Sequence, residues 1–258
     1  MSIIESYDPE RRSSINLEDV YEKSDKTLSV CIINFSYKIM DALMEDGLLE
    51  EFAPDSIRSV ACVYPIYLIK GTKVGIVKTT VGAPMAAGLI EEIAYMFSCK
   101  RFVMFGSCGS LDKSITEGRL IVPTAAYRDE GMSYHYLPPE EDYVTLPHAD
   151  TVSAILTSLG IDHICGKTWT TDAFYRETVR NRERRRQEGC ISVEMEVSAC
   201  QAVATYRGVE FYCFLYRADN LDATKWERGF LSNLSLDQRL LNFSIALEIA
   251  KRVEGGCI

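Results

Sequence analysis

Apolar runs typical of buried strands alternate with segments of helical periodicity along nearly the whole chain, and this alternation constrains the fold most strongly. The expected strands cover residues 28–35, 59–71, 73–80, 101–105, 118–127, 163–171, 190–193 and 209–219. The expected helices cover residues 37–47, 83–97, 148–159 and 174–189, a segment that begins at residue 194, and residues 234–253. This order predicts an α/β fold in which helices cover both faces of a central, mostly parallel or mixed sheet.

The chain is long enough to form one large α/β domain. Its 258 residues are 47% apolar, which can supply a substantial core. No internal repeat, low-complexity linker or change of composition divides it. We therefore expect an N-terminal leader or arm over residues 1–27 and a single domain over residues 28–258. Ligands of such sheets bind where strands end in loops, so a site is expected at those loops.

The charge of the chain argues against nucleic acid as a partner. The formal net charge is −9, whereas nucleic-acid affinity depends mostly on basic surface. One basic run, RNRERRR over residues 180–186, contains an interleaved Glu and lies in an expected helix. We interpret it as a solvated helix face and not as a nucleic-acid patch.

Nine cysteines, an odd number without a Cys-x-x-Cys pair, are spread from Cys31 to Cys257. This pattern favours reduced interior thiols over a disulfide framework or a zinc site, and therefore the cytosol. The N-terminus lacks the layout of a signal peptide, and no apolar run has membrane-spanning length. We expect a soluble, cytoplasmic protein with no membrane partner.

Two segments that contain glycine follow expected strands. FGSCGSL, residues 105–111, places two glycines around Ser107 and Cys108. Glycines let the backbone turn sharply and aim consecutive N–H groups at an anion, although a plain tight turn has the same signature. TVGAP, residues 80–84, leads into a helix N-terminus, where an anion is also favoured. Because no histidine is adjacent to Cys108, we interpret it as a small buried thiol and not as a nucleophile.

Glu194 and Glu196 stand two residues apart at the end of an expected strand. Two carboxylates this close repel each other and are costly to desolvate unless something binds there. An exposed helix start, where the helix dipole favours Glu, is the alternative. The segment RDEGMSYHY, residues 128–136, also concentrates charged residues, but a metal there would need ligands from elsewhere. We interpret it as a loop that shapes a site and expect no metal.

Six segments carry a resemblance to a known family, and they follow the family's order along the chain. They are TTVGAP, GSCGSL, RDEGMSYHYLPP, TTDAFYRE, VEMEVSA and RADN. Together they resemble the nucleoside phosphorylase and nucleosidase superfamily, which includes uridine phosphorylase, hexameric purine nucleoside phosphorylase and methylthioadenosine nucleosidase. The resemblance covers roughly residue 28 to the C-terminus. It implies a nucleoside-phosphorylase-like fold and an enzyme that cleaves an N-glycosidic bond through an oxocarbenium-like ribose.

The resemblance implies a role for each matching residue of the sugar and base sites. Glu196 is the ribose ligand, Met195 the sugar platform and Glu194 a supporting residue. Phe174 matches the aromatic residue that stacks on the base, a contact of about 1–3 kcal/mol in proteins that use it. Asp219 matches the acid that protonates a purine ring nitrogen, so Asp219 and Glu196 are the expected catalytic residues. A core position for Phe174 and a cap or turn position for Asp219 are the alternatives.

The resemblance also implies a phosphate site. Ser107, with the backbone of Gly106 and Gly109, matches the family's phosphate-contacting loop. Lys38 stands where the family has a phosphate-binding Arg. A lysine can still neutralise phosphate, but as a point charge and not as a bidentate fork.

Two departures from the family pattern concern this phosphate site. Asn34 replaces a glycine, and Met104 replaces a second phosphate-binding arginine. Either other cations compensate, with Lys78, Arg58 and Arg217 as candidates, or phosphate binds weakly or not at all. In the second case water becomes the nucleophile.

The cues for the base are mixed. Thr178 stands where uridine-specific members have Gln, which weakens the recognition of uracil, while Arg180 keeps the second uridine cue as a base-binding residue. Asp219 favours purines, and we favour a purine nucleoside over uridine. The family's N-terminal histidine, which a subunit lends to its neighbour, has no counterpart because no His precedes His135. The resemblance still implies a homo-oligomer, either a dimer or a hexamer.

We therefore predict a nucleoside phosphorylase, a pentosyltransferase whose partners are a nucleoside and inorganic phosphate. Its products would be the free base and ribose 1-phosphate, and it would need no organic cofactor. A nucleosidase that uses water instead of phosphate is the first alternative. A nucleoside-binding protein that keeps the fold without catalysis is the second.

Overall fold

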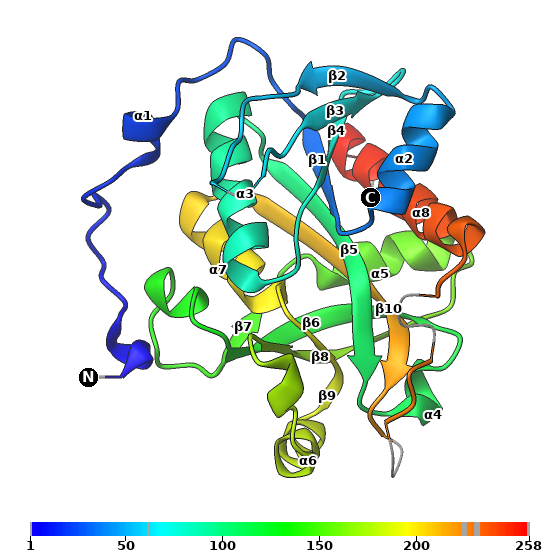
Figure 1. Cartoon of the computed structure of the whole chain (residues 1–258). Helices are drawn as coiled ribbons and strands as arrows, with labels where there is room; N and C mark the ends of the chain where they lie inside the picture. The colour runs from blue at the N-terminus through cyan, green and yellow to red at the C-terminus, as the bar shows by residue number, and fades with distance from the viewer. Residues whose placement is uncertain (1, 61, 223–225, 230–232, 257–258) are drawn as a thin grey trace.

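A ten-stranded mixed sheet runs through the described part of the molecule, and helices cover both of its faces (Figure 1). The computed structural model describes residues 2–60, 62–222, 226–229 and 233–256. The predicted α/β fold class, with a mixed sheet between helices, is confirmed. The predicted boundary at residue 28, between an arm and a domain, stays a prediction.

The sheet combines a closed part and an open part. Its strands are β1 (Val30–Asn34), β2 (Leu49–Ala53), β3 (Ile66–Ile69), β4 (Val74–Lys78), β5 (Arg101–Ser110), β6 (Leu120–Asp129), β7 (Tyr143–Thr145), β8 (His163–Thr171), β9 (Cys190–Glu194) and β10 (Glu210–Asn220). Their order is β10-β6-β8-β9-β5-β1-β4-β3-β2, β7 pairs with β6, and β10 also pairs with β5. The strands from β10 to β5 therefore close on themselves, whereas β1, β4, β3 and β2 extend from β5 as an open sheet.

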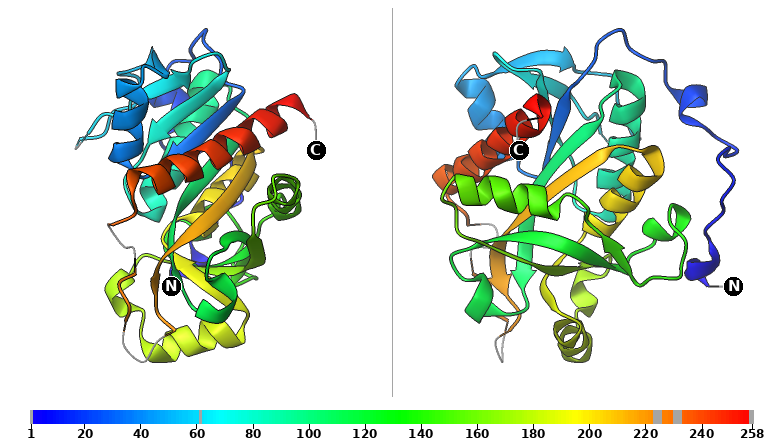
Figure 2. Two further views of the ribbon diagram at one scale, coloured as in Figure 1. Left: turned by 90° about the vertical axis from the view of Figure 1, so that its right-hand side faces the viewer. Right: turned by 180° about the vertical axis from the view of Figure 1, so that it is seen from behind.

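The helices form two layers around this sheet. They are α1 (Leu17–Val20), α2 (Tyr37–Glu45), α3 (Ala83–Phe97), α4 (Lys113–Thr116), α5 (Ala149–Ser158), α6 (Val179–Gln187), α7 (Val197–Arg207) and α8 (Leu236–Gly255), with the 3₁₀ helices η1 (Ile3–Glu5), η2 (Ser133–His135) and η3 (Phe174–Arg176). On one face, α3 and α7 pack against each other; α5 and α8 cover the other face, and α2 packs against α8 (Figures 1 and 2).

Sequence pattern explains these layers. All five residues of β1 are buried, as expected for a central strand with parallel neighbours on both sides. The first eight residues of α7, from Val197 to Ala204, are also buried, and most of them are small. Small side chains let α7 approach α3 closely, which fixes the N-termini of both helices on the same side of the sheet.

Most of the expected elements are confirmed, and residues 83–97 and 163–171 match α3 and β8 to the residue. Several expectations are wrong. β2 and β7 are additional strands, and of the strand expected over residues 59–71 only Ile66–Ile69 form one. Residues 174–189 form η3 and α6 instead of one helix, and the helix expected from Glu194 begins at Val197 because Glu194 still belongs to β9. A further difference, in the glycine segment after Phe105, concerns the site and is described below.

The N-terminal residues run along the outside of α3 and contact the rest of the chain at separate points (Figure 1). Arg11 donates to the carbonyl of Tyr206, and Lys26 donates to the carbonyl of Phe52. None of residues 2–27 is buried, and burial begins at Leu28.

The eight described cysteines are all unpaired, and six of them are buried, as predicted for interior thiols. Cys165 is exposed and Cys62 partly exposed, which the prediction did not distinguish. Cys257 lies outside the described residues. Within the described residues, no helix combines the length and the apolar character needed to cross a bilayer.

Candidate active site

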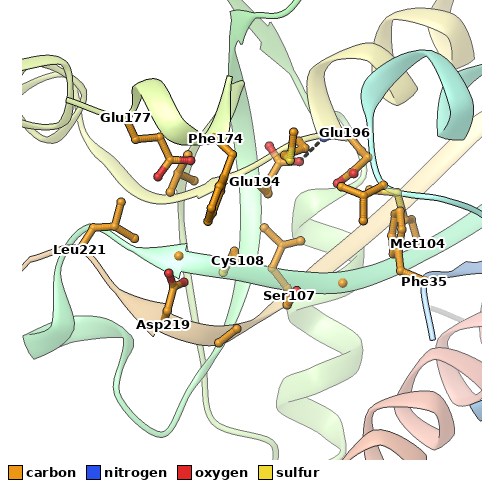
Figure 3. A pocket seen from close by; sticks show the side chains of 17 residues that line it. Phe35, Met104, Ser107, Cys108, Phe174, Glu177, Glu194, Glu196, Asp219 and Leu221 are labelled. Atoms are coloured by element: carbon orange, nitrogen blue, oxygen red, sulfur yellow. Dashed lines mark hydrogen bonds between the residues drawn. The ribbon is translucent and has the colours of Figure 1, made fainter. Parts of the chain in front are cut away.

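A cavity of about 210 Å³ lies where β5, β9 and β10 end (Figure 3). Its lining includes eight of the residues predicted for the site, namely Gly106, Ser107, Gly109, Phe174, Glu194, Met195, Glu196 and Asp219. The structure thus brings together segments from three strands and η3. The roles of these residues stay predictions.

Glu194 ends β9, and its carboxylate caps the N-terminus of α7. The N–H groups of Glu196 and Val197 donate to its Oε2 at 2.7 and 2.8 Å, and Thr170 Oγ1 donates to its Oε1 at 2.5 Å. Burial, and then the neighbouring Glu196, raise the pKa of Glu194 to about 8, against the lowering effect of these donors. Glu194 is therefore held by the protein itself, at a point where it can position Glu196.

Glu196 is the N-cap of α7, and its side chain reaches the segment before α3. The N–H of Gly82 donates to its Oε1 at 2.7 Å. Burial raises the pKa of Glu196 to about 7, the N–H groups of Gly82 and Met195 lower it, and Asp172 raises it further. Gly82 is the N-cap of α3, so the anion held at this helix N-terminus is the carboxylate of Glu196. The alternative of an exposed helix start is wrong, because only 7% of Glu196 is exposed.

Asp219 lies in β10, directly after the point at which the register of β10 with β5 shifts. It is therefore a strand residue and not the cap or turn residue of the alternative interpretation. Trp226 Nε1 donates to its Oδ2 at 2.6 Å. Burial raises the pKa of Asp219, while Trp226 and the charge of Arg217 oppose the rise. A raised pKa suits a carboxyl group that has to carry a proton near neutral pH.

Phe174 and Glu177 enter the cavity from η3 and the residue after it. Phe174 is 40% exposed, so the alternative of a core position is wrong. Figure 3 shows its ring beside the side chain of Glu177 and above Asp219 in this view. Burial, and then the charge of Asp219, raise the pKa of Glu177 to about 8. Glu177 is not among the predicted site residues, and its place three residues after Phe174 in TTDAFYRE is the signal that could have identified it.

The glycine segment continues β5 and does not form the expected loop. Residues 106–110 pair with β10 from Leu215 to Asn220, and neither Gly106 nor Gly109 has a positive φ. A nest needs consecutive N–H groups that point to one side, whereas a strand alternates them, so the nest geometry is absent here. Ser107 is exposed in this strand and lines the cavity.

Close packing explains why residue 109, the second glycine of this segment, has no side chain. A Cβ atom on Gly109 would lie 2.4 Å from Leu221 Cδ1 and 3.1 Å from Asp219 Oδ1. Cys108 is buried and its thiol donates to the carbonyl of Tyr216. This burial confirms the interpretation of Cys108 as a buried thiol, and it also raises the pKa of the thiol.

The cations predicted for the site are not at the cavity. Lys38 and Arg180 are both exposed, and neither is among the lining residues. Of the three compensating candidates, Arg58 pairs with Asp55 at 3.2 Å, Arg217 lies 3.7 Å from Glu117, and Lys78 does not line the cavity. Lys38 and Arg180 therefore lie outside the lining of this cavity, and their predicted contacts with phosphate and with the base stay predictions.

The two residues that depart from the family pattern have structural roles. Asn34 is buried, its Oδ1 accepts the N–H of Ser36 at 2.9 Å, and its Nδ2 donates to the carbonyl of Val77. Met104 is buried and lines the cavity with its apolar side chain. Asn34 therefore shapes the turn between β1 and α2, and Met104 adds no charge to the site.

The segment 128–136 lies away from the cavity and supports α7. The guanidinium of Arg128 donates to the carbonyls of residues 133, 137, 138 and 141. The carboxylate of Glu130 accepts from Ser198 Oγ at 2.8 Å. Its expected contribution to a site is thus indirect, through the helix that Glu196 begins.

The ionisable carboxyl groups at the cavity are Glu177, Glu194, Glu196 and Asp219, and no lysine or arginine of the described residues lines it. Burial raises the pKa of all four groups. The arrangement offers hydrogen bonds to hydroxyls and to polar edges of a ring, an aromatic face, and proton donors. Within the described residues, no group of three or more His, Cys, Asp or Glu side chains is placed to hold a metal ion.

Comparison with known proteins agrees with this geometry. The model of the phosphorylase superfamily matches residues 41–240. A DeoD-type purine nucleoside phosphorylase from Aliivibrio fischeri is 27% identical over 138 residues, which are 52% of this chain and 57% of that relative. The match thus spans little more than half the length of this relative.

Two solved structures share the fold. The purine nucleoside phosphorylase from Toxoplasma gondii in complex with immucillin-H has a TM-score of 0.72 and 20% identity, over 90% of this chain and 93% of that chain. The AMP nucleosidase from Bacteroides thetaiotaomicron has a TM-score of 0.67 and 18% identity, over 89% of this chain and 90% of that chain. At these identities the likeness shows the fold alone.

Proposed function

The chain belongs to the phosphorylase superfamily, and from this premise we propose that it cleaves the N-glycosidic bond of a purine nucleoside with inorganic phosphate as the nucleophile. The observation that carries this proposal is the convergence of Glu196, Phe174 and Asp219 on one cavity. They offer a hydroxyl acceptor, an aromatic face and a carboxyl group with a raised pKa. The hydroxyl acceptor suits the ribose, the aromatic face suits the base, and the carboxyl group can protonate the leaving base.

In the proposed reaction, an oxygen of phosphate forms a bond to C1′ of the ribose while the bond from C1′ to the base nitrogen breaks. The electron pair of the broken bond goes to the base, and Asp219 donates a proton to a ring nitrogen, so that the base leaves neutral. The products are the free purine and ribose 1-phosphate. Glu196 accepts hydrogen bonds from the ribose hydroxyls and stabilises the positive charge that develops on the sugar.

The choice of a purine has two supports. The relative from Aliivibrio fischeri is named a purine nucleoside phosphorylase. Arg180, the remaining cue for uridine, lies outside the cavity, whereas Glu177 and Asp219 line it. A neutral carboxyl group at Glu177 offers one donor and one acceptor to the edge of a purine.

Hydrolysis is the second candidate, and one observation favours it. No cation of the described residues lines the cavity, so nothing there attracts a phosphate dianion, whereas water needs no counter-charge. Under this alternative Asp219 keeps its role, water attacks C1′, and the products are the base and ribose. The two candidates differ only in the nucleophile.

Product analysis tests both candidates. Inosine, adenosine, uridine and methylthioadenosine are incubated with the protein in phosphate buffer and in a phosphate-free buffer, and base and sugar products are separated. Phosphorolysis predicts ribose 1-phosphate and a strict requirement for phosphate, whereas an unchanged rate without phosphate identifies the nucleosidase. Glu196→Ala should abolish turnover and the exposed Glu50→Ala should not. Binding without any product would support the non-catalytic alternative.

Three further features complete the proposal. The reaction needs no organic cofactor, because phosphate and the protein's carboxyl groups supply all the groups that react. Activity that survives exhaustive dialysis would support this. A homo-oligomer, a dimer or a hexamer, and a cytoplasmic location remain predictions, and sedimentation analysis of the purified protein tests the first of them.

A further inference from the structure

A second cavity, of about 330 Å³, adjoins the first and shares with it Phe35, Val81, Ser107 and Ala218. Ser107 is the polar side chain among these four shared residues. Ser36, Tyr216 and Arg239 are among the other residues that line the second cavity. Three hydroxyl groups and one guanidinium group thus surround this space.

The two cavities differ in the charged groups that line them. Four carboxyl groups and no cation of the described residues line the first. No carboxylate of the described residues lines the second, where Arg239 is the charged residue. The first cavity therefore offers no positive charge to a dianion, whereas the second attracts it, since a guanidinium and a phosphate form strong, charge-assisted hydrogen bonds.

Arg239 is held in the second cavity by groups that do not neutralise it. It lies in the first turn of α8, where its Nε donates to the carbonyl of Leu234 at 3.1 Å. Its Nη1 donates to Ser36 Oγ at 3.4 Å. Its charge also opposes the rise that burial causes in the pKa of Tyr216, because the guanidinium lies close to that phenol. The remaining N–H groups of the fork are available to a ligand.

Ser36 adds a second favourable feature. It is the N-cap of α2, and its side chain makes no capping hydrogen bond within the helix. The positive end of the α2 dipole therefore also lies at this cavity, which favours an anion. Lys38, in the same helix turn, is exposed and does not line the cavity.

We propose that the second cavity binds a phosphate group, with Arg239 supplying the charge and Ser36, Ser107 and Tyr216 supplying hydroxyl donors. This proposal rests on the proposed function, because it takes the first cavity as the site of the ribose. Ser107 lines both cavities and would place the phosphate group next to that ribose. The phosphate group is either inorganic phosphate, the nucleophile, or the phosphate of a nucleotide substrate. Where the phosphate group is the nucleophile, Arg239 takes the role that was expected of Lys38.

Isothermal titration calorimetry with inorganic phosphate tests the proposal without any need for catalysis. Arg239→Ala should weaken phosphate binding by about tenfold or more, as expected for the loss of a charged hydrogen-bond donor. The phosphate affinity of Arg239→Lys should lie between that of Arg239→Ala and that of the wild type. Lys251→Ala, which removes an exposed cation from the same helix, is the matched control and should bind phosphate like the wild type. Should Arg239→Ala fail to fold, Tyr216→Phe keeps the ring and should still weaken binding.

A nucleoside 5′-monophosphate, titrated in phosphate-free buffer, separates the two sources of the phosphate group. If the site serves the nucleotide, Arg239→Ala weakens nucleotide binding more than nucleoside binding; if it serves the nucleophile, the variant raises the KM for phosphate. Equal phosphate affinity of Arg239→Ala and wild type overturns the proposal, as does a loss of binding in Lys38→Ala alone. A wild type that binds phosphate through Arg239 but cleaves no nucleoside supports this site and contradicts the proposed function.

Discussion

Asp219 can be tested separately from nucleoside binding. Asn at this position keeps the shape of the side chain and an oxygen that can accept from Trp226, but it cannot carry the proton that the leaving base needs. We expect kcat of Asp219→Asn to fall by about 10²–10⁴-fold, with nucleoside affinity retained. Steady-state kinetics and a binding titration measure the two quantities. Trp226→Phe, which removes the hydrogen bond to Asp219 and keeps an aromatic ring, should cause a smaller fall. An unchanged kcat in Asp219→Asn would exclude the proposed proton transfer.

Glu177 should make the stability of the fold depend on pH. Its pKa is about 8 in the folded chain, raised from 4.5, so the native state holds the proton more tightly than the unfolded state. The resulting stabilisation is complete below the unfolded pKa and is lost as the pH rises through the folded pKa. Glu177→Gln keeps a neutral side chain at all pH values and removes this loss.

Urea unfolding at a series of pH values measures this effect. Between about pH 5 and about pH 8.5, the free energy of unfolding of the wild type should fall more steeply than that of Glu177→Gln, by on the order of 1 kcal/mol or more. Glu50→Gln, on the exposed side of β2, is the control and should follow the wild type. Parallel curves for Glu177→Gln and wild type would show that Glu177 does not titrate in this way.

At the scale of elements, the sequence predicts those strands and helices that form a continuous apolar or periodic segment. Residues 163–171 and 83–97 carry complete local signals and match β8 and α3. β2 was missed because Glu50 and Glu51 are exposed in it, so that it lacks an apolar run. The glycine segment of β5 was misassigned because two glycines indicate a turn locally. Only its pairing with β10, about a hundred residues later in the chain, makes it a strand.

A pair of glycine substitutions tests the close approach of β5, β9 and β10. In Gly109→Ala the new Cβ would meet Leu221 at 2.4 Å, Val193 at 3.0 Å and Asp219 at 3.1 Å. We expect a loss of about 1–3 kcal/mol in stability and a fall in kcat, because Asp219 must move. Gly88→Ala in α3 meets nothing within 4 Å and should stabilise the fold by up to about 1 kcal/mol.

Chemical denaturation and nucleoside turnover of both glycine variants measure these effects. Gly88 is the matched control because it receives the same methyl group in an open place. If Gly109→Ala keeps both stability and kcat, Leu221 must relax without moving Asp219. The assignment of Gly109 as the residue that lets Asp219 approach the cavity would then be wrong.

At the scale of the whole molecule, the candidate site could be predicted only in part. Glu194, Glu196, Phe174 and Asp219 lie in local motifs, and the structure brings them to one cavity. Arg239 carries no local signal, because its contact with Ser36 joins residues 203 positions apart. Lys38 was chosen by its position in the sequence, but the direction of a helical side chain depends on where α2 packs, which the sequence does not state.

The division between an arm and a domain at residue 28 also belongs to this scale. None of residues 2–27 is buried, whereas Leu28 is 3% exposed and packs against Gly75. Deletion of residues 1–16 removes no buried side chain among the described residues, but it removes the hydrogen bond from Arg11 to the carbonyl of Tyr206 and the cation–π contact of Arg11 with the Tyr206 ring. We expect it to lower the free energy of unfolding by less than about 1 kcal/mol and to leave nucleoside cleavage intact.

Leu28→Ala is the contrast to this deletion, since it removes buried side-chain atoms at the first residue of the predicted domain. It should cost about 2–5 kcal/mol, although it changes a single residue. Urea unfolding of the deletion and of Leu28→Ala measures both effects in the same assay. If the deletion destabilises the chain as much as Leu28→Ala, or abolishes cleavage, residues 1–16 are part of the domain or of its site. The boundary would then lie closer to the N-terminus, because scattered surface contacts alone cannot produce a loss of that size.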